Sequence, residues 1–541
     1  MTPVGARPAS PAACDVLVVG GGATGTGLAR DLAMRGLRVM LVEQGDLAHG
    51  TTGRYHGLLH SGGRYVVRDP PSARDCAAEN RIVRRIASWS VEDTGGVFCW
   101  LEGDPEDYPE RFLAGCRAAD VDVEEVAPEI ALQREPLLTP RLRRAFVVAD
   151  ATVQSFELVA GNAAAAEELG SMVRRYTRLV AVSVVNGRVT DVEVEDARTG
   201  ERTRVEVGFL ASASGYWAAR VAALAGVELH MAPGWGTMVI MNQRLSRWVV
   251  NRCRLPGDGD ILVPVGLVSI LGTTDTTLDT DDYEVTPEEV RLIIEESAAM
   301  VPAAATQRVL RVYAGARPIY DPGGDRAARE LSRSHSVLDH TDHGVDNFVS
   351  IVGGKLTTYR LMAEDTADVI CRKLGVTEPC RTATEPLPAA RRPFYTPGER
   401  LTAREEDGGA DAHLVCECEM VTREVLTAFV ESFPGIPRLD DMLRATRLGM
   451  GPCQGGFCSL RAAGLLERER PTGGAAALQR LRDFLDERMK GDRPIMWTDQ
   501  VRQFQLNEIM YRDVLNLDNS PPGLPSPLAG EGQGRGAEGL A

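Results

Sequence analysis

The sequence predicts an α/β fold in which a Rossmann-like dinucleotide-binding domain is interleaved with an antiparallel β-sheet substrate domain, followed by a small helical C-terminal domain. Three observations lead to this prediction. A strand–helix–strand unit with a glycine-rich turn opens the chain of 541 residues, strand-like and helix-like segments then alternate to about residue 374, and four cysteines cluster in one short segment near the C-terminus. Alternation of strands and helices is typical of α/β proteins.

The opening unit is predicted from local patterns. Residues 15–19 form a short apolar run that ends in glycines, as a buried strand does. Residues 23–35 have small and aliphatic side chains at helical spacing, and Gly36 ends this helix. Residues 38–43 are a second strand rich in Val and Leu. Together these segments predict a βαβ unit.

Later segments predict a second kind of sheet. Between residues 178 and 214, valines alternate with other residues and Asn186-Gly187 offers a tight turn, so we expect an antiparallel meander. Further strand-like segments lie between residues 234 and 274. Residues 286–300 begin with Thr, Pro and two glutamates, which is a helix-start signal.

Composition then divides the chain. We expect an oxidoreductase unit over residues 14–375, in which the two subdomains are interleaved, and a Pro- and Arg-rich linker over residues 376–412. The cysteine domain would span residues 413–469, a helical segment residues 470–518, and a disordered tail residues 519–541. That tail is rich in Gly and Pro and has too few apolar residues to fold.

The glycine-rich turn predicts a dinucleotide site. Gly20, Gly22 and Gly25 form a G-x-G-x-x-G string between strand and helix. The first glycine allows the tight turn, the second lets the backbone approach a pyrophosphate at the helix N-terminus, and the third lets helix and strand pack closely. Glu43 closes the second strand, where it can accept hydrogen bonds from ribose hydroxyls. A carboxylate there favours FAD or NAD over NADP.

The cysteine segment predicts a metal centre. Cys416 and Cys418 are one residue apart, and Cys453 and Cys458 enclose four residues that include two glycines. Four thiolates suit either zinc or an iron–sulfur cluster. A C-x-C pair is unusual for zinc, and the glycines leave amide N–H groups free to approach cluster sulfurs, so we favour [2Fe-2S].

Charge and hydropathy exclude several partners. The formal net charge is −16, and binding of nucleic acid depends mainly on neutralising phosphates, so we expect no nucleic-acid partner. The most apolar stretch, residues 261–272, contains Pro264 and is shorter than the ~20 residues that cross a bilayer, so we expect no transmembrane segment. The N-terminal residues lack the apolar core of a secretory signal, which favours a cytoplasmic protein.

Seven segments share the pattern of one known family. They are residues 15–27 (DVLVVGGGATGTG), 36–44 (GLRVMLVEQ), 56–65 (HGLLHSGGRY), 251–254 (NRCR), 261–264 (ILVP), 272–274 (GTT) and 353–360 (GGKLTTYR). With the cysteine segment, they resemble the family of anaerobic glycerol-3-phosphate dehydrogenase A subunits, whose cysteine domain is bacterioferritin-associated-ferredoxin-like. The resemblance covers residues 15–497.

The resemblance implies a function. It implies a quinone-linked flavoprotein of anaerobic respiration that binds FAD and oxidises sn-glycerol 3-phosphate to dihydroxyacetone phosphate. It also implies that electrons leave through the [2Fe-2S] domain to partner subunits, namely a second flavoprotein and a membrane-bound iron–sulfur subunit. The chain would then be cytoplasmic and peripheral on the cell membrane through these partners.

The resemblance also assigns residues. Gly20, Gly22, Gly25 and Glu43 would contact the adenosine and pyrophosphate of FAD, and Ser214, Gly215, Gly353 and Gly354 would contact the rest of the flavin. Arg64, Arg317, Arg333 and Lys355 match positions that line the substrate pocket, and Arg317 and Lys355 would also serve catalysis. A phosphomonoester dianion requires such fixed cations.

Three further residues carry open alternatives. His60 is the candidate base for the C2 hydroxyl proton, since an unperturbed histidine titrates near neutrality, or it packs against the flavin. Thr274, with its neighbours Thr273 and Asp275, would bind the glycerol end or form a tight turn. Trp235 stands where the family commonly has a lysine, which would remove a cation near the flavin.

Two other functions fit these features. The chain could be an FAD-dependent dehydrogenase or oxidase of another small hydroxy- or amino-acid. It could also be a non-catalytic electron-transfer subunit that only holds FAD and a cluster. Reduction of the flavin by substrate distinguishes all three.

Overall fold

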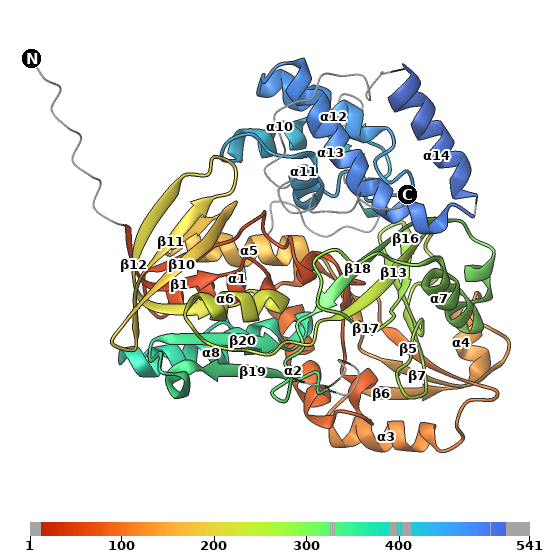
Figure 1. The fold of residues 1–541 in the computed structure, drawn as a ribbon. Helices are drawn as coiled ribbons and strands as arrows, with labels where there is room; N and C mark the ends of the chain where they lie inside the picture. The colour runs from red at the N-terminus through yellow and green to blue at the C-terminus, as the bar shows by residue number, and fades with distance from the viewer. Residues whose placement is uncertain are drawn as a thin grey trace, which may run out of the picture.

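We analysed a computed structural model of the chain, which describes residues 12–324, 326, 328, 331–388, 398–399, 401–402, 413–497 and 499–514. Figure 1 shows a body built around two sheets, with the C-terminal helices packed on one side. The first sheet has eight strands and the second has nine. Most of the linker and the whole tail predicted above lie outside the described residues.

The first sheet is the predicted Rossmann-like sheet. Its parallel strands are β9, β2, β1, β12 and β20, and β10, β11 and β19 pair with them in antiparallel fashion. The strands are β1 (Ala12–Val19), β2 (Val39–Val42), β9 (Met172–Arg174), β10 (Thr177–Val185), β11 (Arg188–Asp196), β12 (Arg202–Ser212), β19 (His335–Asp339) and β20 (Phe348–Gly353). The βαβ unit and the meander β10–β11–β12 are thus confirmed.

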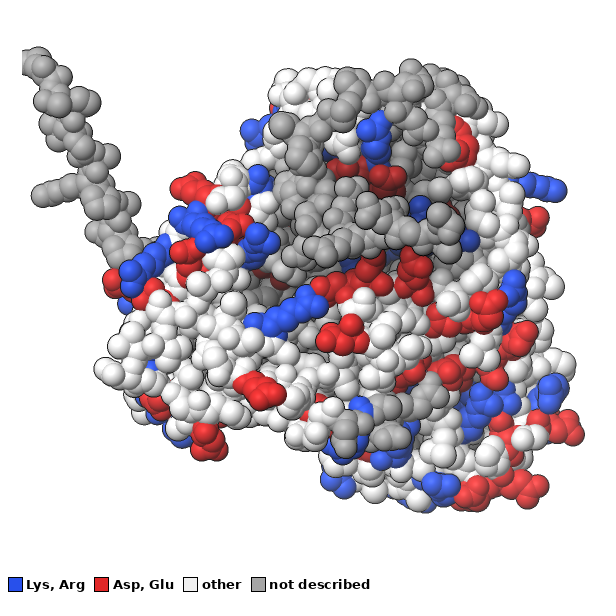
Figure 2. Space-filling model, viewed as in Figure 1, with Lys and Arg blue, Asp and Glu red and all other residues white. Residues whose placement is uncertain are grey.

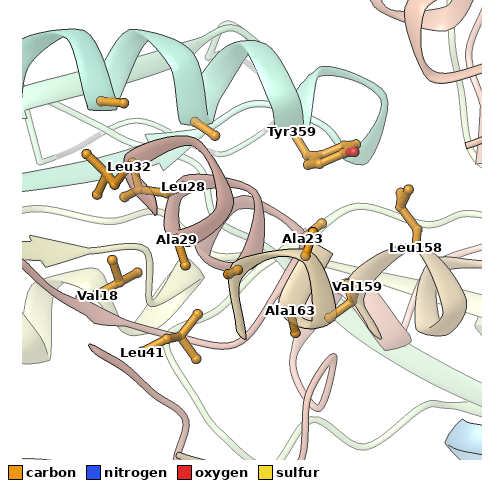
Figure 3. Close-up of a cluster of buried hydrophobic side chains, with 14 of the residues drawn as sticks. Val18, Ala23, Leu28, Ala29, Leu32, Leu41, Leu158, Val159, Ala163 and Tyr359 are labelled. Atoms are coloured by element: carbon orange, nitrogen blue, oxygen red, sulfur yellow. The ribbon is translucent and has the colours of Figure 1, made fainter. Parts of the chain in front are cut away.

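Helices cover this sheet because β1 alternates its side chains between two cores. Val16 and Val18 join the core beneath α1 (Ala23–Met34), α5 (Ser155–Glu168) and α8 (Tyr359–Leu374), whereas Leu17 faces a core that includes α6 (Ala218–Leu224). Figure 3 shows the first of these cores, with Leu28 and Leu32 on the side of α1 that faces α8, and Leu158, Val159 and Ala163 on α5. Fully buried aliphatic side chains of this kind supply roughly 1.5–3 kcal/mol each.

The second sheet is built from chain segments that alternate with those of the first. Its strands are β5 (Gly96–Leu101), β6 (Val123–Val126), β7 (Leu142–Val148), β13 (Gly234–Met241), β14 (Val249–Arg252), β15 (Ile261–Val265), β16 (Val268–Gly272), β17 (Thr276–Thr277) and β18 (Val309–Arg317). The predicted interleaving is therefore present. One pair departs from the predicted antiparallel sheet, because β14 and β5 are parallel.

Further helices and short strands complete the two-sheet body. Helix α7 (Pro287–Met300) begins at Thr286, whose side chain and Glu289 form a capping box, as the helix-start signal predicts. The remaining elements are β3 (Leu58–Leu59), α2 (Pro70–Ile86), β4 (Val91–Glu92), α3 (Tyr108–Ala118), α4 (Pro128–Arg134) and β8 (Ala151–Val153).

The C-terminal part has its own apolar core. It contains α10 (Arg423–Ser432), α11 (Leu439–Thr446), α12 (Cys458–Glu469), α13 (Gly474–Asp492) and α14 (Gln500–Glu508). It is not purely helical as predicted, because β21 (Leu414–Cys416) and β22 (Val421–Thr422) form a small ladder beside the cysteines.

Two further observations concern the distribution of surface charge and the hydropathy of the helices. On the face shown in Figure 2, acidic and basic side chains are interspersed. No helix within the described ranges is both long and apolar enough to span a bilayer.

Candidate functional site

A cavity of about 610 Å³ lies where the two sheets meet. Residues that follow the carboxyl ends of β1, β2, β12 and β20 line one part of it, and residues from the β13–β18 side line the other. Ligands of open α/β sheets bind at the carboxyl ends of the strands. The cavity is therefore the candidate site, and all but one of the predicted FAD and substrate residues line it.

The exception, Gly25, supports the cavity wall from behind. A Cβ atom at Gly25 would lie 1.8 Å from the carbonyl oxygen of Gly20, so only glycine lets α1 approach the turn. Gly20 has a φ of +113°, and a Cβ atom there would lie 2.5 Å from the Ala213 carbonyl oxygen. Gly20 and Gly22 line the cavity at the N-terminus of α1, where free N–H groups favour an anion. This geometry fits a pyrophosphate.

Glu43 lines the cavity beside this turn. Its carboxylate accepts the Gly21 N–H at 2.7 Å and the Gly45 N–H at 2.8 Å. Each carboxylate oxygen has two lone pairs, so both oxygens can still accept a hydroxyl. The two backbone bonds fix the Glu43 carboxylate beside the turn, and its contact with a ribose stays a prediction.

The other predicted flavin contacts continue along the cavity. Ser214 and Gly215 follow β12, Gly353 is the last residue of β20, and Gly354 follows it. The Ser214 hydroxyl is 2.8 Å from that of Ser212. These four residues, together with the turn after β1, give an elongated wall of small residues that leaves room for a dinucleotide.

Four cations gather at the opposite part of the cavity. Arg64, Arg317, Arg333 and Lys355 come from segments far apart in the sequence, and all line it. Each already has a partner on the protein. Arg64 donates to Asp260 at 2.5 Å, and Asp275 lies 2.6 Å from Arg333 and 3.3 Å from Arg317. The cavity thus contains a strongly cationic end held in place by two carboxylates.

Lys355 is oriented by a carbonyl and an aromatic ring. Its Nζ donates to the Arg333 carbonyl oxygen at 2.8 Å and lies 4.4 Å from the centre of the Tyr65 ring. Burial lowers the pKa of the ammonium, and the nearby Arg333 charge acts in the same direction. An ammonium in this setting favours an anionic ligand that would restore its usual pKa.

His60 lines the same cavity as the four cations. Its backbone N–H donates to the Thr357 hydroxyl at 3.0 Å, and its ring packs edge-on against Tyr65. Burial, together with the charges of Arg64 and Lys355, lowers its pKa well below the usual value. The His60 pKa is thus lower than that of an unperturbed histidine, and the choice between a base and a packing residue stays a prediction.

Thr274 and Trp235 both have partners within the protein. The Thr274 hydroxyl lines the cavity, donates to Glu289 at 2.9 Å and accepts the Thr237 N–H at 3.0 Å, and the choice between a substrate contact and a tight turn stays a prediction. Trp235 does not lie on the cavity wall. Its ring is buried, stacks on Tyr283 at 5.1 Å and donates its indole N–H to the Leu278 carbonyl.

Strand geometry explains the position of Trp235. Side chains alternate between the faces of a strand. A Cβ atom at Gly234 or Gly236 would meet Asp275 or Arg317 at 2.6 Å, so these glycines face the site and Trp235 faces away. The tryptophan therefore takes no place among the four cations.

Sequence reasoning missed several supporting residues. Asp260 pairs with Arg64, and Asp150 accepts the Ser61 N–H at 2.7 Å and the Asn251 amide at 3.2 Å, which fixes the loop after His60. Asn251 begins the NRCR segment and Asp260 directly precedes the ILVP segment, so these two motifs could have pointed to both residues. No sequence motif points to Asp150, because isolated acidic residues are common.

The four predicted cysteine ligands come together in the C-terminal domain. The thiol of Cys416 contacts that of Cys458, and Cys453 contacts both Cys418 and Cys458. These contacts lower the pKa of Cys416 and Cys453 and raise that of Cys418 and Cys458. Across the described ranges, however, no group of three or more His, Cys, Asp or Glu side chains has the arrangement of a metal site.

Backbone amides surround the cysteine thiols. The N–H groups of Glu419 and Gly449 point at Cys416, and those of Gly455 and Phe457 point at Cys453. A Cβ atom at Gly451 would lie 2.3 Å from Cys418, so the loop needs glycine there. Amide donors to sulfur stabilise thiolates and tune cluster potentials. The residue types and the amide donors therefore suit a group held by four thiolates, although the described side chains do not have the arrangement of a metal site.

An ion pair and hydrogen bonds attach the cysteine domain to the body, near Glu43 and the turn after β1. Arg444 bonds Asp46 at 3.1 Å, close to Glu43 in the chain, and Tyr176 bonds Asp441. Arg447 joins Glu419, beside the cysteines, to Gln154. Figure 1 shows α10 and α11 above this part of the first sheet.

Comparisons with known proteins agree with this geometry. A family model described as FAD dependent oxidoreductase matches residues 15–360. The A subunit of the anaerobic glycerol-3-phosphate dehydrogenase of Escherichia coli K12 is 41% identical over 527 residues, which cover 93% of this chain and 97% of that protein. The A1 subunit of the Haloferax volcanii enzyme is 41% identical over 538 residues, 94% of this chain and 91% of that protein.

Solved structures share the fold. The glycerol-3-phosphate dehydrogenase of Bacillus halodurans complexed with FAD aligns with a TM-score of 0.64 at 20% identity, over 89% of this chain and 95% of that one. Glycine oxidase of Geobacillus kaustophilus aligns with a TM-score of 0.55 at 22% identity, over 70% of this chain and 99% of that one. The chain belongs to the FAD-dependent oxidoreductases and, within them, to the family of anaerobic glycerol-3-phosphate dehydrogenase A subunits.

Proposed function

We propose that the chain binds FAD and oxidises sn-glycerol 3-phosphate to dihydroxyacetone phosphate. One observation carries this proposal: a single cavity joins a pyrophosphate-binding turn at one end to Arg64, Arg317, Arg333 and Lys355 at the other. Such a cavity accepts a dinucleotide and a small anion side by side. The relatives of the same family, named glycerol-3-phosphate dehydrogenases, support the choice of substrate.

The cations favour a phosphate over a carboxylate. A phosphomonoester carries up to two charges and three acceptor oxygens, and guanidinium forks match that pattern. A single carboxylate of a hydroxy- or amino-acid has one charge and two acceptor oxygens, so it matches the donors of Arg333 and Lys355 less well. The second candidate, oxidation of such an acid, is therefore less well supported.

The residues have distinct tasks in the proposed reaction. FAD, when bound, supplies the oxidant that takes the C2 hydride, and this chemistry is the cofactor's own. His60 takes the proton of the C2 hydroxyl, a role supported by its place in the cavity lining together with the four cations. Arg333 and Lys355 hold the phosphate, while Arg64 and Arg317 keep the charged end in place. Loss of a hydride and a proton leaves the ketone.

The cysteine domain would carry the electrons onward. Cys416, Cys418, Cys453 and Cys458 would hold a [2Fe-2S] cluster, a one-electron carrier, close to the FAD domain. The naming of the relatives as A subunits supports the existence of further subunits. We propose a second flavoprotein and a membrane-bound iron–sulfur subunit that lead to quinone, so the chain would be peripheral on the cytoplasmic face of the membrane.

Anaerobic reduction of the bound flavin tests the substrate. We expect sn-glycerol 3-phosphate to bleach the flavin absorbance of the full chain, and lactate, glycine and glycerol to leave it oxidised. Bleaching by lactate or glycine but not by glycerol 3-phosphate would support the second candidate. No bleaching by any substrate, with FAD bound, would support the non-catalytic electron-transfer role.

A variant pair links the result to the site. Arg333→Gln removes a cation from the cavity and should raise the glycerol 3-phosphate concentration needed for half-bleaching by at least about tenfold, since charged hydrogen bonds are worth about 1.5–3 kcal/mol. Arg117→Gln, an exposed change on α3, should leave it unchanged.

A further inference from the structure

Asp275 occupies the cationic end of the cavity. One carboxylate oxygen lies 2.6 Å from Arg333 and the other 3.3 Å from Arg317, and the side chain is only 8% exposed. Asp275 itself lines the cavity. Its carboxylate therefore spans two guanidinium groups with two oxygens, which is how a phosphate would also bridge them.

Arg317 does not depend on Asp275 for its position. Its guanidinium also donates to the Gly234 carbonyl at 3.1 Å, the Thr273 hydroxyl at 2.5 Å and the Thr274 carbonyl at 3.0 Å. Its terminal N–H groups are thus already engaged by the protein, so Arg317 has little capacity left for a ligand. Its part is to hold the turn that carries Asp275.

Unlike Arg317, Arg333 has side-chain N–H groups left for a ligand. Its Nη2 donates to Asp275, and its backbone N–H, not its side chain, is held by Asp69. A guanidinium has five N–H donors in a planar fork, so the Arg333 side chain retains donors that face the cavity. An incoming phosphate can bind Arg333 only by sharing it with the Asp275 carboxylate or displacing that carboxylate.

We propose that Asp275 is an internal competitor for the phosphate-binding cations, which limits how tightly this end of the cavity binds an anion that has no further contacts. A small free anion gains only the cationic contacts and meets the repulsion of the carboxylate. A phosphorylated substrate gains further contacts through its carbon chain, beside His60, and can offset that repulsion. Asp275 would thus keep inorganic phosphate out while the substrate still binds. The identity of that substrate rests on the function proposed above.

Removing the charge of Asp275 distinguishes two roles of its carboxylate: competition with phosphate for Arg333, and positioning of Arg333. We expect Asp275→Asn, purified with FAD, to bind inorganic phosphate at least tenfold more tightly than the wild type in isothermal titration calorimetry. Asp275→Glu keeps the charge and should bind phosphate as weakly as the wild type. Asp282→Asn, an exposed change in the nearby loop, is the matched control and should behave as wild type.

The opposite result overturns the proposal. If Asp275 only positions Arg333, then Asp275→Asn will bind phosphate equally or more weakly, with FAD content unchanged. Asp275→Ser serves as the second variant if the asparagine protein loses FAD. The titration uses phosphate alone, so it decides the role of Asp275 even if glycerol 3-phosphate fails to reduce the wild-type flavin, which would count against the proposed function instead.

Discussion

At the scale of single residues, the environment of His60 decides how the reaction would respond to pH. A histidine in water titrates near 6.5. Burial and the neighbouring cations push the pKa of His60 well below that value, so the ring stays neutral through the physiological range. A bound phosphate dianion opposes the effect of the cations, and part of the lost basicity returns with substrate.

We therefore predict that kcat/KM for glycerol 3-phosphate is flat from pH 8 down to about 6.5 and falls only at lower pH. The sign follows because protonation of His60 removes the base, and a lowered pKa moves that loss toward acid. His60→Gln should reduce kcat by at least about 100-fold, the usual contribution of a general base. Steady-state assays with an artificial acceptor measure both effects.

The control is His230→Gln, at an exposed histidine, and it should change neither kcat nor the pH dependence of kcat/KM. A wild-type acid limb centred above pH 6.5, or a His60→Gln enzyme with full kcat, would show that another group accepts the proton.

The residue scale also shows where sequence reasoning stops. The glycine string and Glu43 could be placed from spacing alone, because both lie within one local unit of strand, helix and strand. Arg64, Arg317 and Lys355 could not, since tertiary folding brings them together, and only a family resemblance suggested them. The pKa of His60 and the outward face of Trp235 depend on burial and strand parity, which spacing does not reveal.

At the scale of elements, the contact between α13 and β18 holds the C-terminal part of the chain against the second sheet. A Cβ atom at Gly491 would lie 2.3 Å from the Val312 carbonyl oxygen and 2.4 Å from the Arg311 side chain. The carbonyl belongs to β18, which pairs with β13 along its length and cannot move alone. Glycine is thus required for this close approach.

Gly491→Ala should lower the stability of the docked C-terminal domain by about 1–3 kcal/mol, as other overpacked contacts do. Differential scanning calorimetry and limited proteolysis measure this effect. Gly464→Ala in α12 is the matched control, because its Cβ would meet nothing within 4 Å, and alanine favours a helix. Equal unfolding temperatures for the two variants would contradict the proposed contact.

Element order was easier to predict than element pairing. The meander β10–β11–β12 could be predicted because its strands are consecutive and alternate cleanly. The parallel pair β14 and β5 could not, because its partners are about 150 residues apart and no local pattern links them. The ladder β21–β22 was missed because its strands have only three and two residues.

At the scale of the whole molecule, the cavity and the cysteine cluster lie in two parts of the chain that contact each other. The cavity lies between the two sheets, and the cysteine thiols lie in a domain with its own core. The ion pair Arg444–Asp46 joins the two parts near Glu43. Substrate oxidation should therefore survive damage to the cysteine domain.

Cys453→Ser should abolish the iron content and the visible signature of a [2Fe-2S] cluster while glycerol 3-phosphate still bleaches the flavin. Cys371→Ser, a buried cysteine of α8 far in sequence from the quartet, should retain the iron. Iron and zinc analysis of anaerobically purified protein provides the measurement. Stoichiometric zinc without iron in the wild type would contradict the cluster assignment.

The most direct test of the central claim follows both centres in one sample. Full-length protein is mixed anaerobically with sn-glycerol 3-phosphate, and flavin absorbance and the electron paramagnetic resonance spectrum are recorded together. We predict loss of the oxidised flavin absorbance together with the signal of a reduced [2Fe-2S] cluster. A flavin that stays oxidised, or a reduced flavin beside a cluster that never accepts an electron, would contradict the proposed function.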